Sequence, residues 1–171
     1  MPLFPSGWQD VTTNRGNIEV IDYVPKGETV VAWRNRITLE VYHDLNTLPL
    51  DALYRRAEGQ NRDVCDGEIV GKFQSGLNNG FASAFWTLGC KRHRETSMGE
   101  TRYSKAIQGG DRVYILTRAW RTPAYGDEGP AIPQRLLEDA VAFLTTTVAC
   151  TDGDANHPCP TSTPAKSEEK K

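Results

Sequence analysis

The sequence predicts an α+β fold in which an antiparallel sheet of about five to six strands is packed by two helices. Apolar and polar residues alternate over 36–43, which is typical of a strand. Residues 50–64 and 136–148 instead space their apolar side chains three and four positions apart, which is typical of helices. The remaining loops are too short for parallel crossovers, so we expect neighbouring strands to run antiparallel.

The first part of the chain, residues 8–24, predicts a strand or a hairpin with a turn at Asn14-Arg15-Gly16-Asn17. Pro25 ends this segment because proline has no backbone N–H to donate to a sheet. We expect a short helical turn over residues 30–33.

The strand over 36–43 has two distinct faces. Its apolar face consists of Ile37, Leu39, Val41 and His43. Its polar face consists of Arg36, Thr38, Glu40 and Tyr42. We expect the first face to meet the core and the second to be wetter. Pro49 suits the first turn of the helix that follows, and Gly59 weakens its second half.

The second half of the chain predicts further strands. Residues 68–74 form a weak strand candidate, 75–80 a loop with a turn at Asn79-Gly80, and 81–88 a strand. Residues 91–99 are polar and indicate a loop, and segments 102–107 and 113–120 form a hairpin around Gln108-Gly109-Gly110-Asp111. After a connector over 121–130, Pro133 opens the second helix. We expect one domain over residues 1–159 and a disordered polar tail over 160–171.

The composition excludes several classes of protein. The 171 residues carry a net charge of −2, so no basic field favours nucleic acid or anionic lipid. No run of 18 apolar residues is present, so we expect no membrane span.

The four cysteines allow three pairings, and proximity favours Cys65–Cys90 and Cys150–Cys159. Loops of these sizes would contribute about 3.5 and about 2.7 kcal/mol in the chain-entropy model. Disulfides indicate a periplasmic or secreted protein, although residues 1–8 lack the features of a signal peptide. The alternative is a cytoplasmic protein with four free thiols.

The chain contains few groups that indicate catalysis or metal binding. His43 lies on the core-facing register of its strand, and His93 lies among basic residues. Cys150, His157 and Cys159 fit no standard zinc site, and Asp152, Asp154 and Asn156 lack the glycine and glutamate of an EF-hand loop. We therefore predict no metal and no cofactor, and we assign no catalytic residue.

The 102–121 hairpin is rich in basic and aromatic residues and is the candidate binding surface. Its binding candidates are Arg102, Lys105, Arg118 and Trp120, accompanied by Tyr103, Arg112, Tyr114 and Arg121. Such a face could hold an anionic ligand. The alternative is a solvated face whose long side chains cover apolar surface.

The layout resembles the PsbP-like superfold, which also occurs in DcrB-type envelope proteins. The resemblance rests on Trp8, the strand end Tyr23-Val24-Pro25, the segment Gly27-Glu28-Thr29 leading to Trp33, and the terminal helix Leu136–Val148. More narrowly, the Val-Pro-x-Gly-Glu-Thr-x-x-x-Trp pattern and the ending His157-Pro158-Cys159-Pro160 resemble proteobacterial extracytoplasmic proteins. This resemblance implies an α/β/α sandwich and a binding or accessory role.

The sequence therefore favours a non-enzymatic extracytoplasmic domain that binds a small ligand or an envelope protein. One alternative is a small hydrolase-type enzyme, in which His43, His93 and a carboxylate would have to meet in one cleft. The other is a cytosolic interaction or adaptor protein.

Overall fold

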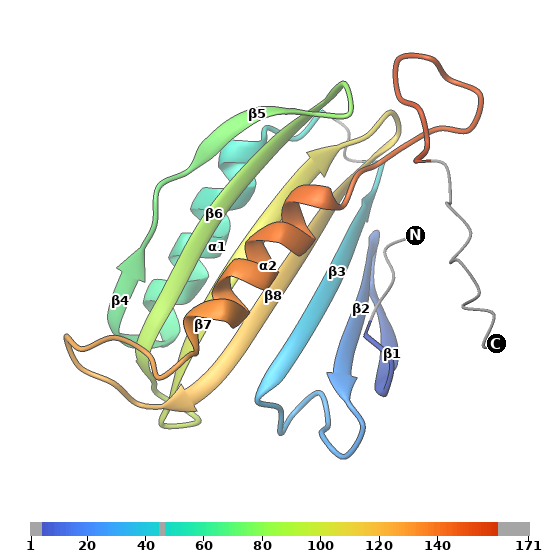
Figure 1. Cartoon of the computed structure of the whole chain (residues 1–171). Coiled ribbons are helices and arrows are strands. Elements are labelled where there is room, and N and C mark those ends of the chain that lie inside the picture. Colours follow the sequence, from blue (N-terminus) through green and yellow to red (C-terminus); the bar gives the residue numbers. More distant parts are fainter. Residues whose placement is uncertain (1–4, 45–46, 161–171) are drawn as a thin grey trace, which may run out of the picture.

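An antiparallel sheet of eight strands forms the centre of the computed structural model, which describes residues 5–44 and 47–160 (Figure 1). The strands are β1 (Trp8–Arg15), β2 (Ile18–Pro25), β3 (Asn35–His43), β4 (Cys65–Val70), β5 (Gln74–Asn78), β6 (Phe81–His93), β7 (Met98–Gln108) and β8 (Arg112–Pro123). Their order across the sheet is β1-β2-β3-β8-β7-β6-β4, and β5 also pairs with β6. Every pair is antiparallel.

The two helices, α1 (Leu50–Val64) and α2 (Gln134–Thr146), lie on opposite faces of this sheet (Figure 1). Helix α1 contacts β4, β6 and β7, and α2 contacts β7 and β8 on the other face. The predicted α+β class is thereby confirmed. The sheet has more strands than the five to six expected, because the N-terminal segment forms a full hairpin and β4 and β5 are separate strands.

Three local predictions are wrong. Residues 75–80 are not a loop, because β5 runs to Asn78 and pairs with β6; only Asn79 and Gly80 form the turn, with φ of 51° and 82°. The positive φ of both residues is that of a type I′ hairpin turn, which asparagine and glycine tolerate best. Strand β6 extends to His93, so the loop expected over 91–99 shrinks to a short turn.

The third wrong prediction is the helical turn over 30–33, where the chain forms only bends. Here the Thr29 side chain accepts a hydrogen bond from the Ala32 N–H over 3.0 Å, and the Ala32 carbonyl accepts one from Thr29 N–H. The hydroxyl contact is one that a helix N-cap also makes, but the Thr29 N–H bonds a carbonyl three residues ahead, whereas a helical N–H bonds a carbonyl four residues behind. The segment therefore closes as a bend.

Both faces of the sheet contribute to the core. On the α1 face, Leu50 and Leu53 pack against a cluster that includes Trp86, while on the α2 face Leu144 packs with Ile37 and Leu116. The polar face of β3, expected to be wetter, is buried at Thr38 and Tyr42. Both faces of β3 are therefore buried or half-buried, whereas an alternating strand usually has one solvated face.

The cysteines form the two disulfides that proximity favoured, Cys65–Cys90 and Cys150–Cys159. The first joins the start of β4, directly after α1, to β6, and the second closes a loop beyond α2. Two disulfides fit an oxidising, extracytoplasmic environment. Neither described helix has the length and apolarity that crossing a bilayer requires. Residues 161–171 of the expected tail lie outside the described residues.

Candidate functional site

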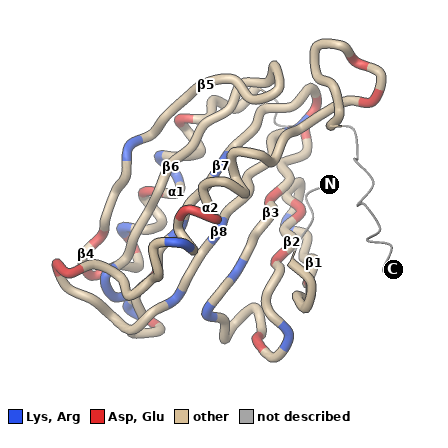
Figure 2. Tube along the Cα trace, viewed as in Figure 1, with Lys and Arg blue, Asp and Glu red and all other residues tan. Residues whose placement is uncertain are grey.

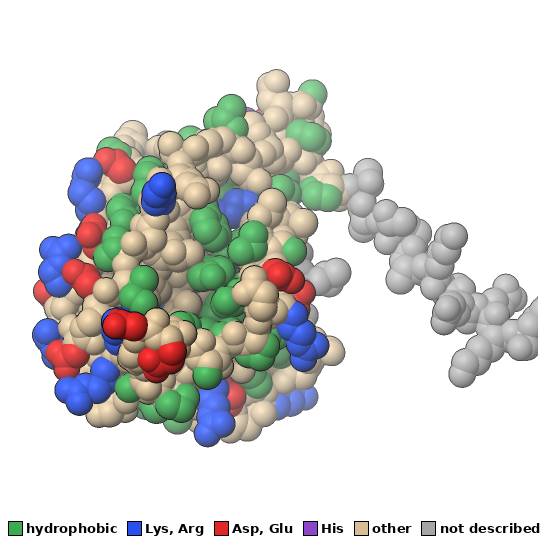
Figure 3. All heavy atoms as spheres, turned by 60° about the vertical axis from the view of Figure 1, so that its left-hand side comes forward, with side chains coloured by type: hydrophobic (Ala, Val, Ile, Leu, Met, Phe, Trp, Pro, Cys, Tyr) green, Lys and Arg blue, Asp and Glu red, His purple; other side chains and the backbone are tan. Residues whose placement is uncertain are grey.

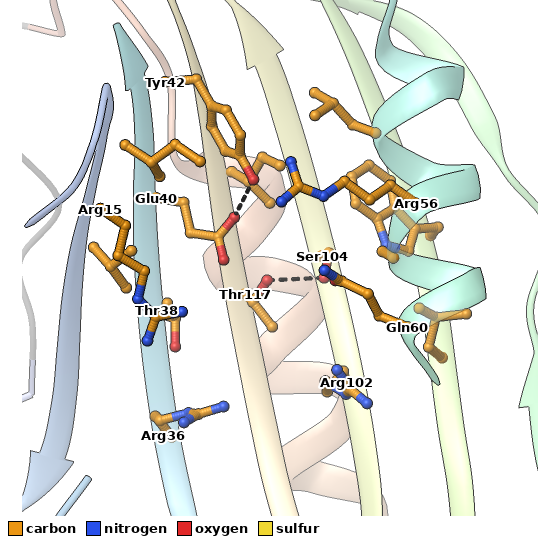
Figure 4. Close-up of a pocket in the computed structure, with 17 residues that line it drawn as sticks. Arg15, Arg36, Thr38, Glu40, Tyr42, Arg56, Gln60, Arg102, Ser104 and Thr117 are labelled. Carbon is orange, nitrogen blue, oxygen red and sulfur yellow. Dashed lines mark hydrogen bonds between the residues drawn. The ribbon is translucent and has the colours of Figure 1, made fainter. Parts of the chain in front are cut away.

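The α1 face of the sheet contains a cavity of about 400 Å³, bounded by α1 on one side and by β1 to β3 on the other (Figure 4). Helix α1 lies over β4, β6 and β7, and the strands beside it form a more open floor. A volume in this range is typical of small-molecule sites, which span about 300–1,000 Å³. Its polar lining is drawn in Figure 4.

Four arginines from four different elements line this cavity: Arg15 of β1, Arg36 of β3, Arg56 of α1 and Arg102 of β7. Among the described residues they donate one hydrogen bond between them, from Arg102 Nη2 to Asn61 Oδ1 over 2.7 Å. Elsewhere the arginines Arg55, Arg62, Arg92, Arg94 and Arg112 all have a carboxylate oxygen within 3.2 Å. Most guanidinium donors in the cavity therefore have no hydrogen-bond acceptor among the described residues.

Strand register places two of these arginines side by side. Arg36 of β3 and Arg102 of β7 both lie opposite Ala119 of β8, which is fully buried. Paired residues project from the same face of a sheet, and two strand spacings separate the two backbones by about 10 Å. Both guanidiniums lie at the same end of the cavity, one on each side of β8 (Figure 4).

The next row of the floor is a row of hydroxyls. Thr117 of β8 lies between Thr38 and Ser104, and the Ser104 and Thr117 hydroxyls are 2.9 Å apart. One row further, Glu40 accepts a hydrogen bond from the Tyr42 hydroxyl over 2.8 Å. The floor thus presents guanidinium, hydroxyl and carboxylate groups in succession along the strands.

The arginine end of the cavity has an excess of positive charge. Burial lowers the pKa of Arg36, and the charges of Arg121 and Arg102 lower it further, while Asp22 and Glu100 act in the opposite direction. Burial also lowers the pKa of Arg102, and the charge of Arg121 lowers it further, while Glu100 and Glu40 act in the opposite direction. Arginine stays protonated in proteins, and the carboxylates in ion-pair contact with Arg36, Arg102 and Arg121 are those of Asp22 and Glu100. An anion in the cavity would relieve the mutual repulsion of the three guanidiniums.

Helix α1 supplies the opposite wall because Leu53, Arg56, Ala57 and Gln60 recur at helical spacing on one face. Arg56 reaches from this wall toward Tyr42 (Figure 4). Burial raises the pKa of Tyr42, Glu40 raises it further, and the positive charge of Arg56 lowers it. The Tyr42 phenol therefore stays a hydrogen-bond donor that holds Glu40 in place.

Comparisons with known proteins add little to this geometry. No family model matches the chain, and no curated protein matches it. Among solved structures, the Ran-binding protein Mog1p of Saccharomyces cerevisiae is similar, with a TM-score of 0.46 and 9% identity over 83% of this chain and 77% of Mog1p. The cavity is therefore interpreted from its own residues.

The binding candidates of the hairpin divide between the two faces of the sheet. Only Arg102 lines the cavity; Lys105, Arg118 and Trp120 lie on the α2 face, because their cross-strand partners there are Leu116, Tyr103 and Thr101. Lys105 is buried and bonds three carbonyls at the end of α2. The Arg118 guanidinium stacks between Trp8 and Trp120, at 5.0 and 4.9 Å. The expected single basic face does not form.

The histidines lie apart. His43 at the end of β3 pairs with Arg112, and His93 at the end of β6 pairs with Cys65, so they lie at opposite ends of the sheet. His157 stacks on Phe81 with ring centroids 3.7 Å apart and contacts the Asn79 carbonyl. Cys150 and Cys159 are bonded to each other, which removes both thiolates from any zinc site.

Sequence reasoning missed most of the cavity. The sequence predicts the polar face of β3 but assigns no binding role to Arg15, Arg36, Arg56 or Gln60. The available signal was that face itself: an arginine, a threonine and a glutamate alternate on a strand whose other face is apolar. Such residues line a site where a helix packs over part of the same face of the sheet. The sequence does not reveal which strands the helix covers.

Other hollows lie on the α2 face. Cavities of about 230, 340 and 520 Å³ flank α2, and exposed Leu77 of β5 and exposed Val141 of α2 line the second of them. Figure 3 shows apolar side chains gathered around a hollow in this view, with charged side chains toward its margins. Acidic residues lie on α2 itself, in the connector before it and in the C-terminal loop (Figure 2). The four-arginine cavity is distinct from all of these.

Proposed function

We propose that this protein is a non-enzymatic binding domain that works outside the reducing interior and holds a small anionic ligand in the four-arginine cavity. The observation that carries the proposal is that Arg15, Arg36, Arg56 and Arg102 converge there while donating one hydrogen bond to the described residues. A guanidinium presents five donors in a planar fork that matches carboxylate and phosphate oxygens.

The electrostatics of the arginine end support an anion rather than a cation. Asp22 lies 3.7 Å from Arg36 Nε, and Glu100 lies 3.9 Å from Arg102 Nε and 2.9 Å from Arg121 Nε. Two carboxylates thus serve three guanidiniums. The Nε atoms of Arg36 and Arg102 are buried without a hydrogen-bond partner among the described residues. Unsatisfied buried donors destabilise a protein by about 1–3 kcal/mol each, and repacking around an anion would satisfy them.

The proposal assigns no reaction to the cavity. The hydrolase alternative required His43 and His93 in one cleft, and their positions at opposite ends of the sheet do not support it. The extracytoplasmic part of the proposal is supported by the two disulfides. Kinship with PsbP-like envelope proteins belongs to the same proposal and is supported by the single helix on each face of the sheet.

Anion binding is tested by titrating the purified protein with inorganic phosphate and with citrate in a calorimeter. We expect heat of binding in the wild type and at least a tenfold loss of affinity, about 1.4 kcal/mol, in the Arg36→Met and Arg102→Met variants. Arg55→Met is the matched control, because Arg55 lies on the outer side of α1 and pairs with Asp51 over 2.8 Å. Circular dichroism establishes that each variant is folded. Equal affinity in all three variants would reject this site.

The compartment is tested on protein taken from its native cells. Alkylation of free thiols, with and without prior reduction, should modify cysteines only after reduction. Four thiols that react without reductant would contradict the extracytoplasmic part of the proposal and leave anion binding unaffected.

A further inference from the structure

We propose that the ligand is a hydroxylated organic anion, of the class of sugar acids and sugar phosphates. This inference rests on the proposed function, because it takes the anion to lie at Arg36 and Arg102. The supporting observation is that a row of hydroxyls, and then a carboxylate, follow those arginines along the floor of the cavity.

The strand register fixes the order of these groups. Arg36, Thr38 and Glu40 follow one another at alternate positions of β3, so all three project onto the cavity floor. Alternate residues of a strand are about 6.6 Å apart, so Glu40 lies about 13 Å along the strand from Arg36. A ligand whose anionic group contacts the arginines therefore extends over the hydroxyl row toward Glu40.

The groups along this path both donate and accept hydrogen bonds. The hydroxyls of Thr117 and Ser104 bond each other, and each keeps further capacity to bond a ligand. Glu40 accepts a hydrogen bond from Tyr42 at Oε2, and its Oε1 accepts none from the described residues. A carboxylate accepts hydrogen bonds only, so the matching part of the ligand must donate. A polyol provides such donors at every carbon.

The size and polarity of the cavity disfavour two simpler occupants. About 400 Å³ is the space of roughly a dozen water molecules at about 30 Å³ each, so an inorganic anion would leave most of it unfilled. An alkyl carboxylate would cover Glu40 and Thr117 without offering a hydrogen-bond partner to either. Leaving buried polar groups unpaired is the physical basis on which a polar site rejects an apolar analogue.

Four probes of matched size separate these possibilities. D-glucuronate and D-glucose 6-phosphate carry both an anion and hydroxyls, cyclohexanecarboxylate carries the anion alone, and D-glucose carries hydroxyls alone. We expect one or both hydroxylated anions to bind the wild type at least about tenfold more tightly than either incomplete probe. The better of the two identifies whether the anionic group is a carboxylate or a phosphate.

Two variants test the assigned contacts. Glu40→Gln and Thr117→Val are close to isosteric, and each should lower the affinity for the hydroxylated anion at least about fivefold relative to the affinity for cyclohexanecarboxylate. The ratio is the readout because loss of the Glu40 charge strengthens the binding of both anions alike. The control is Glu95→Gln, because Glu95 lies exposed in the turn between β6 and β7, away from the cavity. It should change neither affinity.

The outcomes distinguish this inference from the proposed function. If cyclohexanecarboxylate binds as tightly as D-glucuronate and D-glucose 6-phosphate, with the same loss in Arg36→Met, the anion site stands and the hydroxylated class is rejected. The hydroxylated class is also rejected if D-glucose binds as tightly as the anions. If neither hydroxylated anion nor inorganic phosphate binds at millimolar concentration, both proposals are rejected.

Discussion

Lys105 donates a hydrogen bond from Nζ to the carbonyl oxygen of Leu144 over 2.8 Å, in the buried layer between β7 and α2. The same ammonium group also bonds the carbonyls of Thr147 at 2.7 Å and Thr145 at 3.3 Å. The last carbonyls of a helix have no partners within the helix and carry partial negative charge. Lys105 therefore closes the end of α2 from a neighbouring strand.

Replacement of Lys105 by methionine should destabilise the protein by about 2–4 kcal/mol, because three carbonyls then lose their shared donor in a buried place. Urea denaturation followed by circular dichroism measures this change in the free energy of unfolding. The control is Lys72→Met, since Lys72 is exposed. A loss no larger than that of the control would show that Lys105 does not stabilise α2.

The stabilising effect of Lys105 should depend on pH. Burial lowers the pKa of Lys105 from 10.5 to about 8. Between these two values the unfolded chain keeps the proton that the folded protein has released, so the unfolded state binds more protons and stability rises with pH. Below pH 8 both states are protonated and this contribution is constant.

The measurement is the difference in unfolding free energy between wild type and Lys105→Met, taken on the acid side of pH 8 and again toward pH 10.5. This difference should increase with pH, since methionine does not titrate. A decrease would mean that the carbonyls of α2 require the charged ammonium rather than its hydrogen bonds.

The position of Lys105 also shows how far the sequence alone leads. Local patterns predicted both helices and the long hairpin, because apolar spacing and turn residues are local properties. Arg102 and Lys105 are three residues apart on one strand, however, and therefore project from opposite faces. The site itself depends on the strand order β3-β8-β7, which brings Arg36 beside Arg102. No local sequence pattern predicts that β3 and β7 both lie beside β8.

Asn61 should be a positioning residue for the cavity. It is fully buried, donates from Nδ2 to the Gly89 carbonyl over 3.0 Å and accepts from Arg102 Nη2 over 2.7 Å. Asn61→Ala should lower the free energy of unfolding by about 2–3 kcal/mol and weaken phosphate binding, because Arg102 loses its anchor. Asn61→Asp keeps the acceptor but adds a negative charge, and should therefore weaken phosphate binding as well. Unchanged phosphate affinity in both variants would exclude a positioning role.

The two disulfides should contribute unequally to stability. Cys65 and Cys90 are 25 positions apart and Cys150 and Cys159 are 9 apart, and the loops that they close correspond to about 3.5 and about 2.7 kcal/mol in the chain-entropy relation. The paired Cys65→Ala and Cys90→Ala substitutions should therefore lower the unfolding free energy more than the Cys150→Ala and Cys159→Ala pair. Urea denaturation of the two double variants gives the order directly. Asn79 donates hydrogen bonds to the Ala149 and Pro158 carbonyls of the C-terminal loop. The reverse order of the two losses would show that this loop unfolds cooperatively with the core.

Glu100 should link the stability of the fold to the occupancy of the cavity. It is buried, and its Oε1 accepts a hydrogen bond over 2.9 Å from Arg121 Nε, whose guanidinium also stacks on Trp33 at 4.1 Å. Glu100→Gln removes one of the two carboxylates that offset three guanidiniums, and breaking such a buried pair costs about 3–5 kcal/mol. An anion at Arg36 and Arg102 would supply the missing negative charge. Saturating phosphate should therefore raise the melting temperature of Glu100→Gln by more than it raises that of the wild type. An equal rise in both proteins would place the bound anion away from the arginine end.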